Sequence, residues 1–235
     1  MLAVFKREMR SYFTGVIGYL FVVLYLAIAG VVLCYTTLFS NSADVSTYFT
    51  LMLVISAVML PLLTMKSFSE ERKQKTEQLL MTAPVSITGV VLGKFLAAYV
   101  MFAACISLTS LYSLVLTIYS SLKVAILFGN LIAILLVGAV YIAIGIFVSS
   151  LTENQLSAAV GTMAILLGFL AIGVVSMLFN TQFWLRYVLN FISIFTRFQN
   201  FTSGYFDIAS TVYYISIAAI FIYLTIRIYD RRRYN

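Results

Sequence analysis

The sequence predicts an all-α integral membrane protein with six transmembrane helices. Hydrophobic residues make up 63% of the 235 residues and charged residues only 10%, whereas an ordinary soluble domain carries about a quarter. The mean hydropathy of +1.05 is too high for a chain that folds around a core facing water. Six continuous apolar stretches reach about 20 residues, the length that a helix needs to cross the hydrocarbon core. We therefore expect residues 1–235 to form a single transmembrane domain.

The six apolar stretches are predicted to be helices, because they lack the alternation that the strands of a membrane barrel require. The third and fourth are longer than a straight crossing needs, so they are expected to tilt or to extend past the bilayer. The predicted spans are Val16–Phe39, Thr47–Met65, Val90–Tyr119, Val124–Ser150, Ser157–Phe179 and Thr211–Tyr229.

The basic residues predict the orientation. If the N-terminus is cytoplasmic, twelve Lys and Arg residues lie inside and three lie outside, and such a bias places both termini in the cytoplasm. A net charge of +7 distributed in this way indicates a multi-pass protein of the inner cell membrane and not a nucleic-acid-binding protein. The inside residues are Lys6, Arg7, Arg10, Lys66, Arg72, Lys73, Lys75, Lys94, Arg227, Arg231, Arg232 and Arg233, and the outside residues are Lys123, Arg186 and Arg197.

Residues 1–14 are predicted to form a helix that lies in the membrane interface. At 100° per residue, apolar and aromatic side chains share one face and three cations lie on the other. The apolar face would rest on the bilayer, with the cations near lipid phosphates. A simple basic flank to the first span is the alternative. The apolar face contains Leu2, Phe5, Met9, Tyr12 and Phe13, and the cationic face contains Lys6, Arg7 and Arg10.

The segment 66–93 predicts a short, charged cytoplasmic helix. Ser67 and Glu70 have the spacing of a capping box, and two oppositely charged pairs at i,i+4 support the helix. Pro84 ends the helix, and the chain restarts near Ser86 to enter the third span. The charged pairs are Glu71 with Lys75 and Lys73 with Glu77.

Apolar residues follow this charged helix: Leu79, Leu80 and Met81. Apolar side chains beside water favour a partner surface or the bilayer interface. We therefore expect the helix to dock on a cytoplasmic partner, although a solvated loop is the alternative.

Two other segments are candidates for function. In the short inner turn 151–156, the negative charge of Glu153 either stabilises the N-terminus of the following helix through the helix dipole or contacts a cytoplasmic partner. Thr152 and Gln155 have the spacing of a capping box. The outer segment 180–210 is rich in aromatic rings, which prefer the membrane interface. Short helices are expected there, because Phe191, Phe195 and Phe198 follow helical spacing.

Several classes of function are disfavoured by residues that the chain lacks. Without histidine there is no Ser-His or Cys-His pair, and no catalytic, cofactor or metal site is predicted. Gly93-Lys94 lacks the preceding glycine of a nucleotide-binding loop, so any ATPase would be a separate chain. No charge falls near the middle of a span, which weakens the hypothesis of an ion-coupled carrier.

Three stretches resemble ABC type-2 transporter permeases. Residues 71–86, Glu-Arg-Lys-Gln-Lys-Thr-Glu-Gln-Leu-Leu-Met-Thr-Ala-Pro-Val-Ser, resemble the loop after the second span, with Lys75 where the family usually has glycine and Ala83 where serine is usual. Residues 145–155 resemble the short turn after the fourth span. Residues 5–13, followed by Ile17-Gly18-Tyr19, resemble the start of the gliding-motility and copper-site-maturation branch.

The resemblance implies roles for particular residues. The helix of about residues 70–81 would be the coupling helix that seats in a cleft of the ATPase, and outer re-entrant helices would form a gate. The implied ATPase-coupling residues are Glu70, Glu71, Arg72, Glu77, Leu79, Leu80 and Glu153, and the implied gate or interface residues are Trp184, Phe191, Phe195 and Phe198.

The function expected from this resemblance is that of a permease subunit of an ABC transporter. Two ATPase subunits and a second permease chain, identical or related, would complete the complex, and an extracytoplasmic accessory protein is a further expected partner. ATP hydrolysis would drive export of a substrate or mechanical work on that partner. The alternatives are a membrane scaffold that anchors a cytoplasmic protein without transport and, less favoured, an ion-coupled secondary carrier.

Overall fold

A computed structural model of the chain describes residues 1–39, 45–76, 86–119, 124–178, 189–190, 193–202 and 207–234. Within these residues the chain is helical and contains no β-strand. Six helical stretches of the described residues are long and apolar enough to cross a membrane, as the sequence predicts. The helices are α1 (Leu2–Thr14), α2 (Val16–Leu33), the π-helical η1 (Cys34–Phe39), α3 (Val45–Thr64), α4 (Lys66–Lys73), α6 (Ile87–Tyr119), α7 (Val124–Leu151), α8 (Gln155–Leu178), α10 (Ile194–Thr202) and α11 (Ile208–Tyr234).

The predicted spans match the observed helices closely, with one difference at the second span. α6 has 33 residues and is about 50 Å long, so it exceeds the bilayer core as expected. α3 and α4, however, are almost continuous, because the residue between them, Met65, keeps right-handed helical dihedrals. The charged helix is therefore an extension of the second span and does not begin after a loop.

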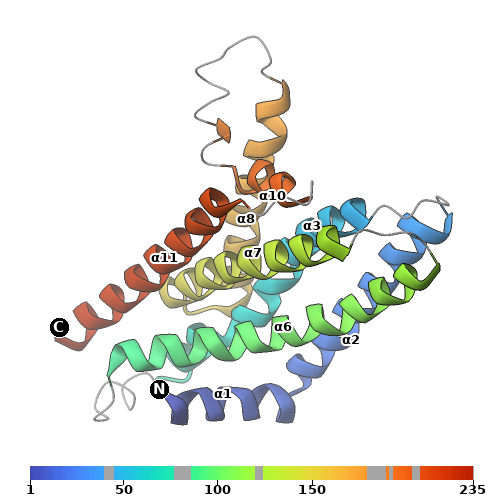
Figure 1. Cartoon of the computed structure of the whole chain (residues 1–235). Coiled ribbons are helices and arrows are strands. Elements are labelled where there is room, and N and C mark those ends of the chain that lie inside the picture. Colours follow the sequence, from blue (N-terminus) through green and yellow to red (C-terminus); the bar gives the residue numbers. More distant parts are fainter. Residues whose placement is uncertain are drawn as a thin grey trace.

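α7 is the central helix of the bundle, and α3, α6, α8, α10 and α11 all pack against it (Figure 1). Its residues Val140–Ile144 are all inaccessible to solvent. The contact with α3 is close at Gly145, where a Cβ atom would lie 2.2 Å from the Thr64 Oγ1 atom. A residue without a side chain is required at that position for the two helices to approach.

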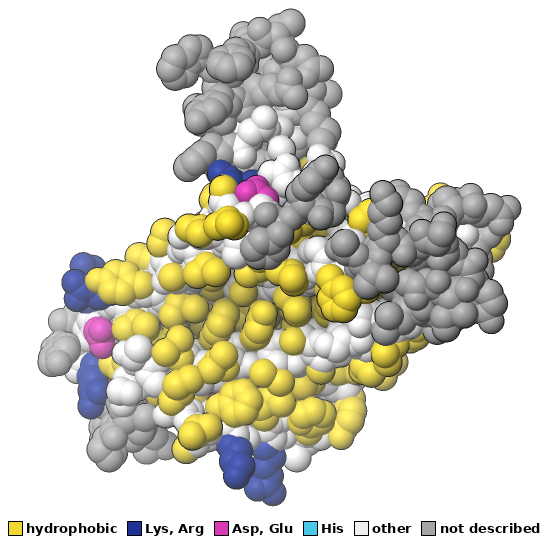
Figure 2. Space-filling view, viewed as in Figure 1, with side chains coloured by type: hydrophobic (Ala, Val, Ile, Leu, Met, Phe, Trp, Pro, Cys, Tyr) yellow, Lys and Arg dark blue, Asp and Glu magenta, His cyan; other side chains and the backbone are white. Residues whose placement is uncertain are grey.

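The outer surface of the bundle has the character of a membrane protein. Figure 2 shows a broad band of apolar side chains on one face, with the Lys, Arg, Asp and Glu side chains of the described residues near its edges. The apolar windows of α2 and α11 are each only 22% buried inside the chain. Such large apolar faces are stable only against lipid or another protein.

The N-terminal helix α1 is a separate helix, as predicted, but part of its apolar face lies inside the bundle. Met9 and Tyr12, which were expected to face the bilayer, pack against the core of the bundle, whereas Leu2 and Phe13 are exposed. The chain then turns at Gly15 into α2, and the helices approach closely: a Cβ atom at Gly18 would lie 2.1 Å from the Tyr12 carbonyl oxygen. α1 is thus held against α2 and α6 along much of its length.

Candidate functional site

The candidate site lies at the end of the bundle where α1, α4, the start of α6 and the turn between α7 and α8 meet. Figure 1 places α1, the start of α6 and the C-terminal end of α11 toward this end, and α10 toward the other. The site therefore combines segments that are distant in the sequence. Three sets of polar contacts connect them.

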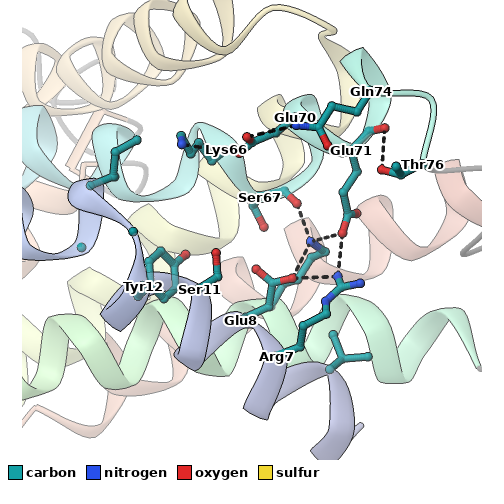
Figure 3. Close-up of a pocket in the computed structure, with 15 residues that line it drawn as sticks. Arg7, Glu8, Ser11, Tyr12, Lys66, Ser67, Glu70, Glu71, Gln74 and Thr76 are labelled. Atoms are coloured by element: carbon teal, nitrogen blue, oxygen red, sulfur yellow. Dashed lines mark hydrogen bonds and ion pairs between the residues drawn. The ribbon is translucent and has the colours of Figure 1, made fainter.

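The first set is an ionic cluster of four side chains: Arg7, Glu8, Glu71 and Lys94 (Figure 3). The Lys94 Nζ atom lies 3.0 Å from a carboxylate oxygen of Glu8 and 3.0 Å from one of Glu71. The Arg7 guanidinium is 2.8 Å from Glu8 and 2.6 Å from Glu71. Two cations and two anions thus neutralise each other and join α1, α4 and α6.

Burial makes this cluster energetically important. The Lys94 side chain is 2% exposed and the side chains of Glu8 and Glu71 are 16% exposed. Lys94 also donates a hydrogen bond to the Ser67 carbonyl oxygen at 2.5 Å and lies over the Phe68 ring. A buried ammonium is tolerated only with such partners, because an unpaired charge in a low-dielectric interior is very costly.

The Glu8 carboxylate shows the electrostatic effect of the cluster. Burial raises its pKa, but the charges of Lys94 and Arg7 and their hydrogen bonds outweigh burial and hold the pKa below its ordinary value of 4.5. Glu8 is therefore ionised at neutral pH and contributes its full negative charge to the cluster.

The second set of contacts centres on Ser149, a fully buried residue of α7. Its Oγ atom accepts the backbone N–H groups of Phe68 and Ser69, both at 3.1 Å, and its hydroxyl donates to the Met65 carbonyl oxygen at 3.1 Å. One side chain thus satisfies three backbone groups where α3 continues into α4. This contact attaches α4 to the central helix of the bundle.

The third set joins α4 to the turn between α7 and α8, two segments that the sequence singled out. The Arg72 guanidinium lies 3.0 Å from the Glu153 carboxylate and donates to the Leu151 carbonyl oxygen at 2.9 Å. Arg72 is 27% exposed and Glu153 is 69% exposed, so this junction remains accessible to a partner. Two residues predicted to contact an ATPase therefore lie side by side.

α4 ends earlier than the charge pattern predicted. Its last turn is a Schellman motif, in which the Thr76 N–H bonds to the Glu71 carbonyl oxygen and the Lys75 N–H to the Arg72 carbonyl oxygen. Lys75 has a φ of 57°, in the left-handed region where glycine is favoured. This conformation gives a physical reason for the glycine that is usual in the resembling family at this position.

Several sequence-based expectations for local structure are wrong. Glu71 does not pair with Lys75, because the helix has ended there and the cluster occupies its carboxylate. Ser67 caps no helix, because α3 continues into α4. The Asn154 side chain, and not Thr152, accepts the N–H of Leu156 at the start of α8, while Thr152 bonds back to the Val148 carbonyl oxygen.

The remaining coupling candidates divide into two groups. Glu70 is described and forms an i,i+4 pair with Lys66 at 3.6 Å. Glu77, Leu79 and Leu80 lie outside the described residues.

At the opposite end, the described part of the aromatic segment contains the short helix α10. Phe198 is fully buried in the core, and Phe195 packs against it while half-buried. The Tyr214 hydroxyl donates to the Ile194 carbonyl oxygen at 2.9 Å, which attaches α10 to α11. Trp184 and Phe191 lie outside the described residues, so a gate remains a prediction.

The family follows from a comparison with family models. The model of the ABC-2 family transporter protein matches residues 35–228, which cover nearly all of the last five spans. The chain belongs to the ABC-2 transporter family. No curated protein matches it.

As an ABC-2 family member, the chain is a permease subunit, that is, the membrane domain of an ABC transporter and not its nucleotide-binding domain. Permeases of this family work with ATPase subunits, which supports the kind of partner expected from the sequence. The match begins at residue 35, so α1 and the branch-like motif of residues 5–19 lie outside it. The gliding-motility and copper-site-maturation branch therefore stays a prediction.

Four residues of the site in this ABC-2 permease were not predicted from the sequence: Arg7, Glu8, Lys94 and Ser149. Arg7 was expected to lie near lipid phosphates, and Lys94 was considered only as a cytoplasmic cation and as an incomplete nucleotide-binding motif. A signal for Lys94 was present, because it lies well inside the long apolar helix α6, where a charge requires a partner. No local pattern pointed to Ser149, whose role depends on the packing of α7 against α4.

Proposed function

We propose that this permease couples ATP hydrolysis by separate ATPase subunits to export of a substrate or to mechanical work on an extracytoplasmic partner. The junction of Arg72, Leu151 and Glu153 carries the proposal. It joins α4 to the turn between α7 and α8, the two segments that resemble ATPase-contacting segments of ABC type-2 permeases, and the Glu153 side chain in it is 69% exposed.

In this proposal α4 acts as a lever between the ATPase and the bundle. A push on its exposed end is passed to α7 through Ser149, to the α7–α8 turn through Arg72, and to α1 and α6 through the ionic cluster. Rigid movement of packed helices is a common way to transmit such a push over a distance. Glu71 then acts inside the permease, and residues 77–81 and Glu153 supply the outer contact.

The proposed complex contains two ATPase subunits and a second permease chain, identical or related. Both termini lie in the cytoplasm, as the excess of Lys and Arg on that side favours. The apolar faces of α2 and α11 leave room for a second permease chain. An extracytoplasmic accessory protein is proposed from the branch resemblance alone.

Cysteine crosslinking tests whether an ATPase contacts the junction. Cys34 and Cys105 are first replaced by serine, and single cysteines are then placed at Lys73, at Glu153 and, as a control at the opposite end, at Ile208. Crosslinking in native membranes is expected to join positions 73 and 153, but not 208, to a subunit whose peptides contain a nucleotide-binding loop. Capture of proteins without such a loop contradicts coupling and favours the scaffold alternative.

A charge reversal then separates contact from folding. Arg72→Glu is expected to lower the ATP turnover of the co-purified complex at least fivefold, and the double variant Arg72→Glu/Glu153→Arg restores the internal pair with the charges exchanged. If ATP turnover stays low in the double variant, the ATPase itself contacts Arg72 or Glu153 and depends on the sign of their charges. Full recovery means that the pair only stabilises the permease, and the proposed contact is then wrong.

A further inference from the structure

A cavity of about 650 Å³ lies between α1, α4 and the beginnings of α2 and α6 (Figure 3). Its volume falls within the range of about 300–1,000 Å³ that is typical of sites for small ligands. The ionic cluster forms part of its wall, and the remainder includes Lys66, Glu70 and Ser11 and the corner between α1 and α2. None of the roles proposed above uses this space.

The charges around the cavity are balanced. Its described lining contains three cations, Arg7, Lys66 and Lys94, and three carboxylates, Glu8, Glu70 and Glu71. A wall of this kind has no net attraction for a simple anion or cation. It suits a ligand that carries one charge of each sign.

Lys66 and Glu70 are held more loosely than the cluster: they pair with each other, and the only other contact is a long hydrogen bond of 3.4 Å from the Gln74 side-chain amide to Glu70, among the residues that the structure describes. The Lys66 and Glu70 side chains are 38% and 35% exposed, and their 3.6 Å separation is longer than a direct hydrogen bond. The Ser11 hydroxyl, which also lines the cavity, has no hydrogen-bond partner among the described residues. By contrast, the four charges of the ionic cluster already satisfy one another.

The order of groups along the cavity matches that of a phospholipid. In Figure 3, Ser11, Tyr12 and Lys66 lie toward one side, and Glu71, Gln74 and Thr76 lie toward the other. The first side adjoins Gly15 and Ile17, where the first transmembrane helix begins. From the corner between α1 and α2 outward the cavity thus offers Gly15 and Ile17, then Lys66 with Ser11, and then the side of Glu71.

The geometry points to a binding site for the zwitterionic headgroup of phosphatidylethanolamine from the leaflet that adjoins α1. The phosphate accepts hydrogen bonds from the Lys66 ammonium and the Ser11 hydroxyl, and the primary ammonium donates to Glu70. A choline headgroup fits less well, because its quaternary ammonium donates no hydrogen bond and is usually bound by several aromatic rings. Tyr12 is the only aromatic residue in the described lining.

Native mass spectrometry tests the site on the full chain. The purified protein is equilibrated in micelles with equal amounts of phosphatidylethanolamine, phosphatidylcholine and phosphatidylglycerol. The wild type is expected to retain phosphatidylethanolamine at least fivefold over the other two lipids. Glu70→Gln and Lys66→Met are each expected to abolish this preference, because each removes one of the two charges.

Lys73→Met is the matched control, because Lys73 belongs to the same helix and is exposed but is absent from the cavity wall. This variant is expected to keep the full preference. Preferential retention of phosphatidylglycerol by the wild type, or equal loss of preference in Lys73→Met, shows a general basic patch and overturns the proposal. Water-soluble glycerophosphoethanolamine is the second probe: binding as tight as that of the lipid shows a soluble ligand and overturns the lipid assignment.

Discussion

The Lys94 ammonium lies 3.0 Å from the Glu71 carboxylate, deep in the contact between α6 and α4. Glu8 and Arg7 from α1 complete the surroundings of the two groups, so that three helices share one set of charges. The sequence predicted that Glu71 contacts the ATPase, but in the structure its carboxylate is paired with Lys94 and Arg7 of the same chain. This arrangement distinguishes residues that hold α4 in place from residues that present it to a partner.

The first prediction concerns this pair. Glu71→Gln is expected to lower the free energy of unfolding by about 1.5–3 kcal/mol, because Lys94 and Arg7 each lose a charged hydrogen-bond partner. In the double variant with Lys94→Met the loss is smaller than the sum of the single losses, as expected for residues in direct contact. Denaturant titration of the purified chain in detergent measures both values.

Glu70→Gln is the control for Glu71→Gln, since Glu70 lies on the same helix but its pair with Lys66 is about one-third exposed and is long, at 3.6 Å. Exposed pairs contribute about 0–1 kcal/mol, so this variant should change stability little. If Glu70→Gln and Glu71→Gln lower the free energy of unfolding equally, the ionic cluster does not stabilise the chain. The same follows if the losses caused by Glu71→Gln and Lys94→Met add exactly in the double variant.

Ser149 provides the second prediction. Ser149→Ala leaves the N–H groups of Phe68 and Ser69 without their acceptor, and each buried unsatisfied group costs about 1–3 kcal/mol. Hydrogen exchange at these two amides should accelerate, and the thermal midpoint should fall. Ser150→Ala is the control, because among the described residues the Ser150 hydroxyl bonds only to the Phe147 carbonyl oxygen of its own helix. Indistinguishable variants would show that Ser149 does not hold α4.

A third prediction follows from the left-handed residue at the end of α4. Lys75→Gly is expected to stabilise the chain by about 1 kcal/mol, because a side chain at φ 57° is strained and glycine is not. Gln74→Gly, one residue earlier at a φ of −84°, should instead destabilise by about 0.5–1 kcal/mol. Thermal unfolding of both variants is the measurement, and destabilisation by Lys75→Gly would show that the turn has another conformation.

The fourth prediction tests the contact between α7 and α3. Gly145→Ala places a Cβ atom 2.2 Å from Thr64 Oγ1 and 2.9 Å from Thr64 Cβ, and overpacking of this kind costs about 1–3 kcal/mol. Gly168→Ala in α8 meets nothing within 4 Å and should stabilise the helix by up to about 1 kcal/mol. Relative to the wild type, the thermal midpoint should fall in Gly145→Ala and rise in Gly168→Ala. The same sign for both would mean that the two helices lie farther apart.

The fifth prediction is the pH dependence that Glu8 confers. Because its pKa in the folded chain is lower than its ordinary value of 4.5, Glu8 adds stability above that pH and loses it as the pH falls through the folded value. The free energy of unfolding should therefore decrease as the pH is lowered from 7, and this decrease should be smaller in Glu8→Gln than in the wild type. An unchanged decline in this variant would assign the acid sensitivity to other carboxylates.

The sequence predicted the membrane helices well and the polar contacts poorly. α6 and α7 lie close to the expected boundaries, and the short turn expected at residues 151–156 lies at residues 152–154, because hydropathy is a property of contiguous residues. The local charge pattern misassigned the partners of Glu71, since the i,i+4 rule assumes that the helix continues past Lys75. The capping residues were also wrong where α3 and α4 join and where α8 begins.

The sequence by itself determined that this chain is a helical membrane protein, which side of each span is rich in cations, and that it resembles ABC type-2 permeases. Only the tertiary structure decided that Lys94 meets Glu8 and Glu71, that Ser149 holds α4, and that Arg72 meets Glu153. The reason is physical. The free energy of placing a residue in lipid depends mainly on that residue and its neighbours in the chain, whereas an ion pair between helices depends on how whole helices pack.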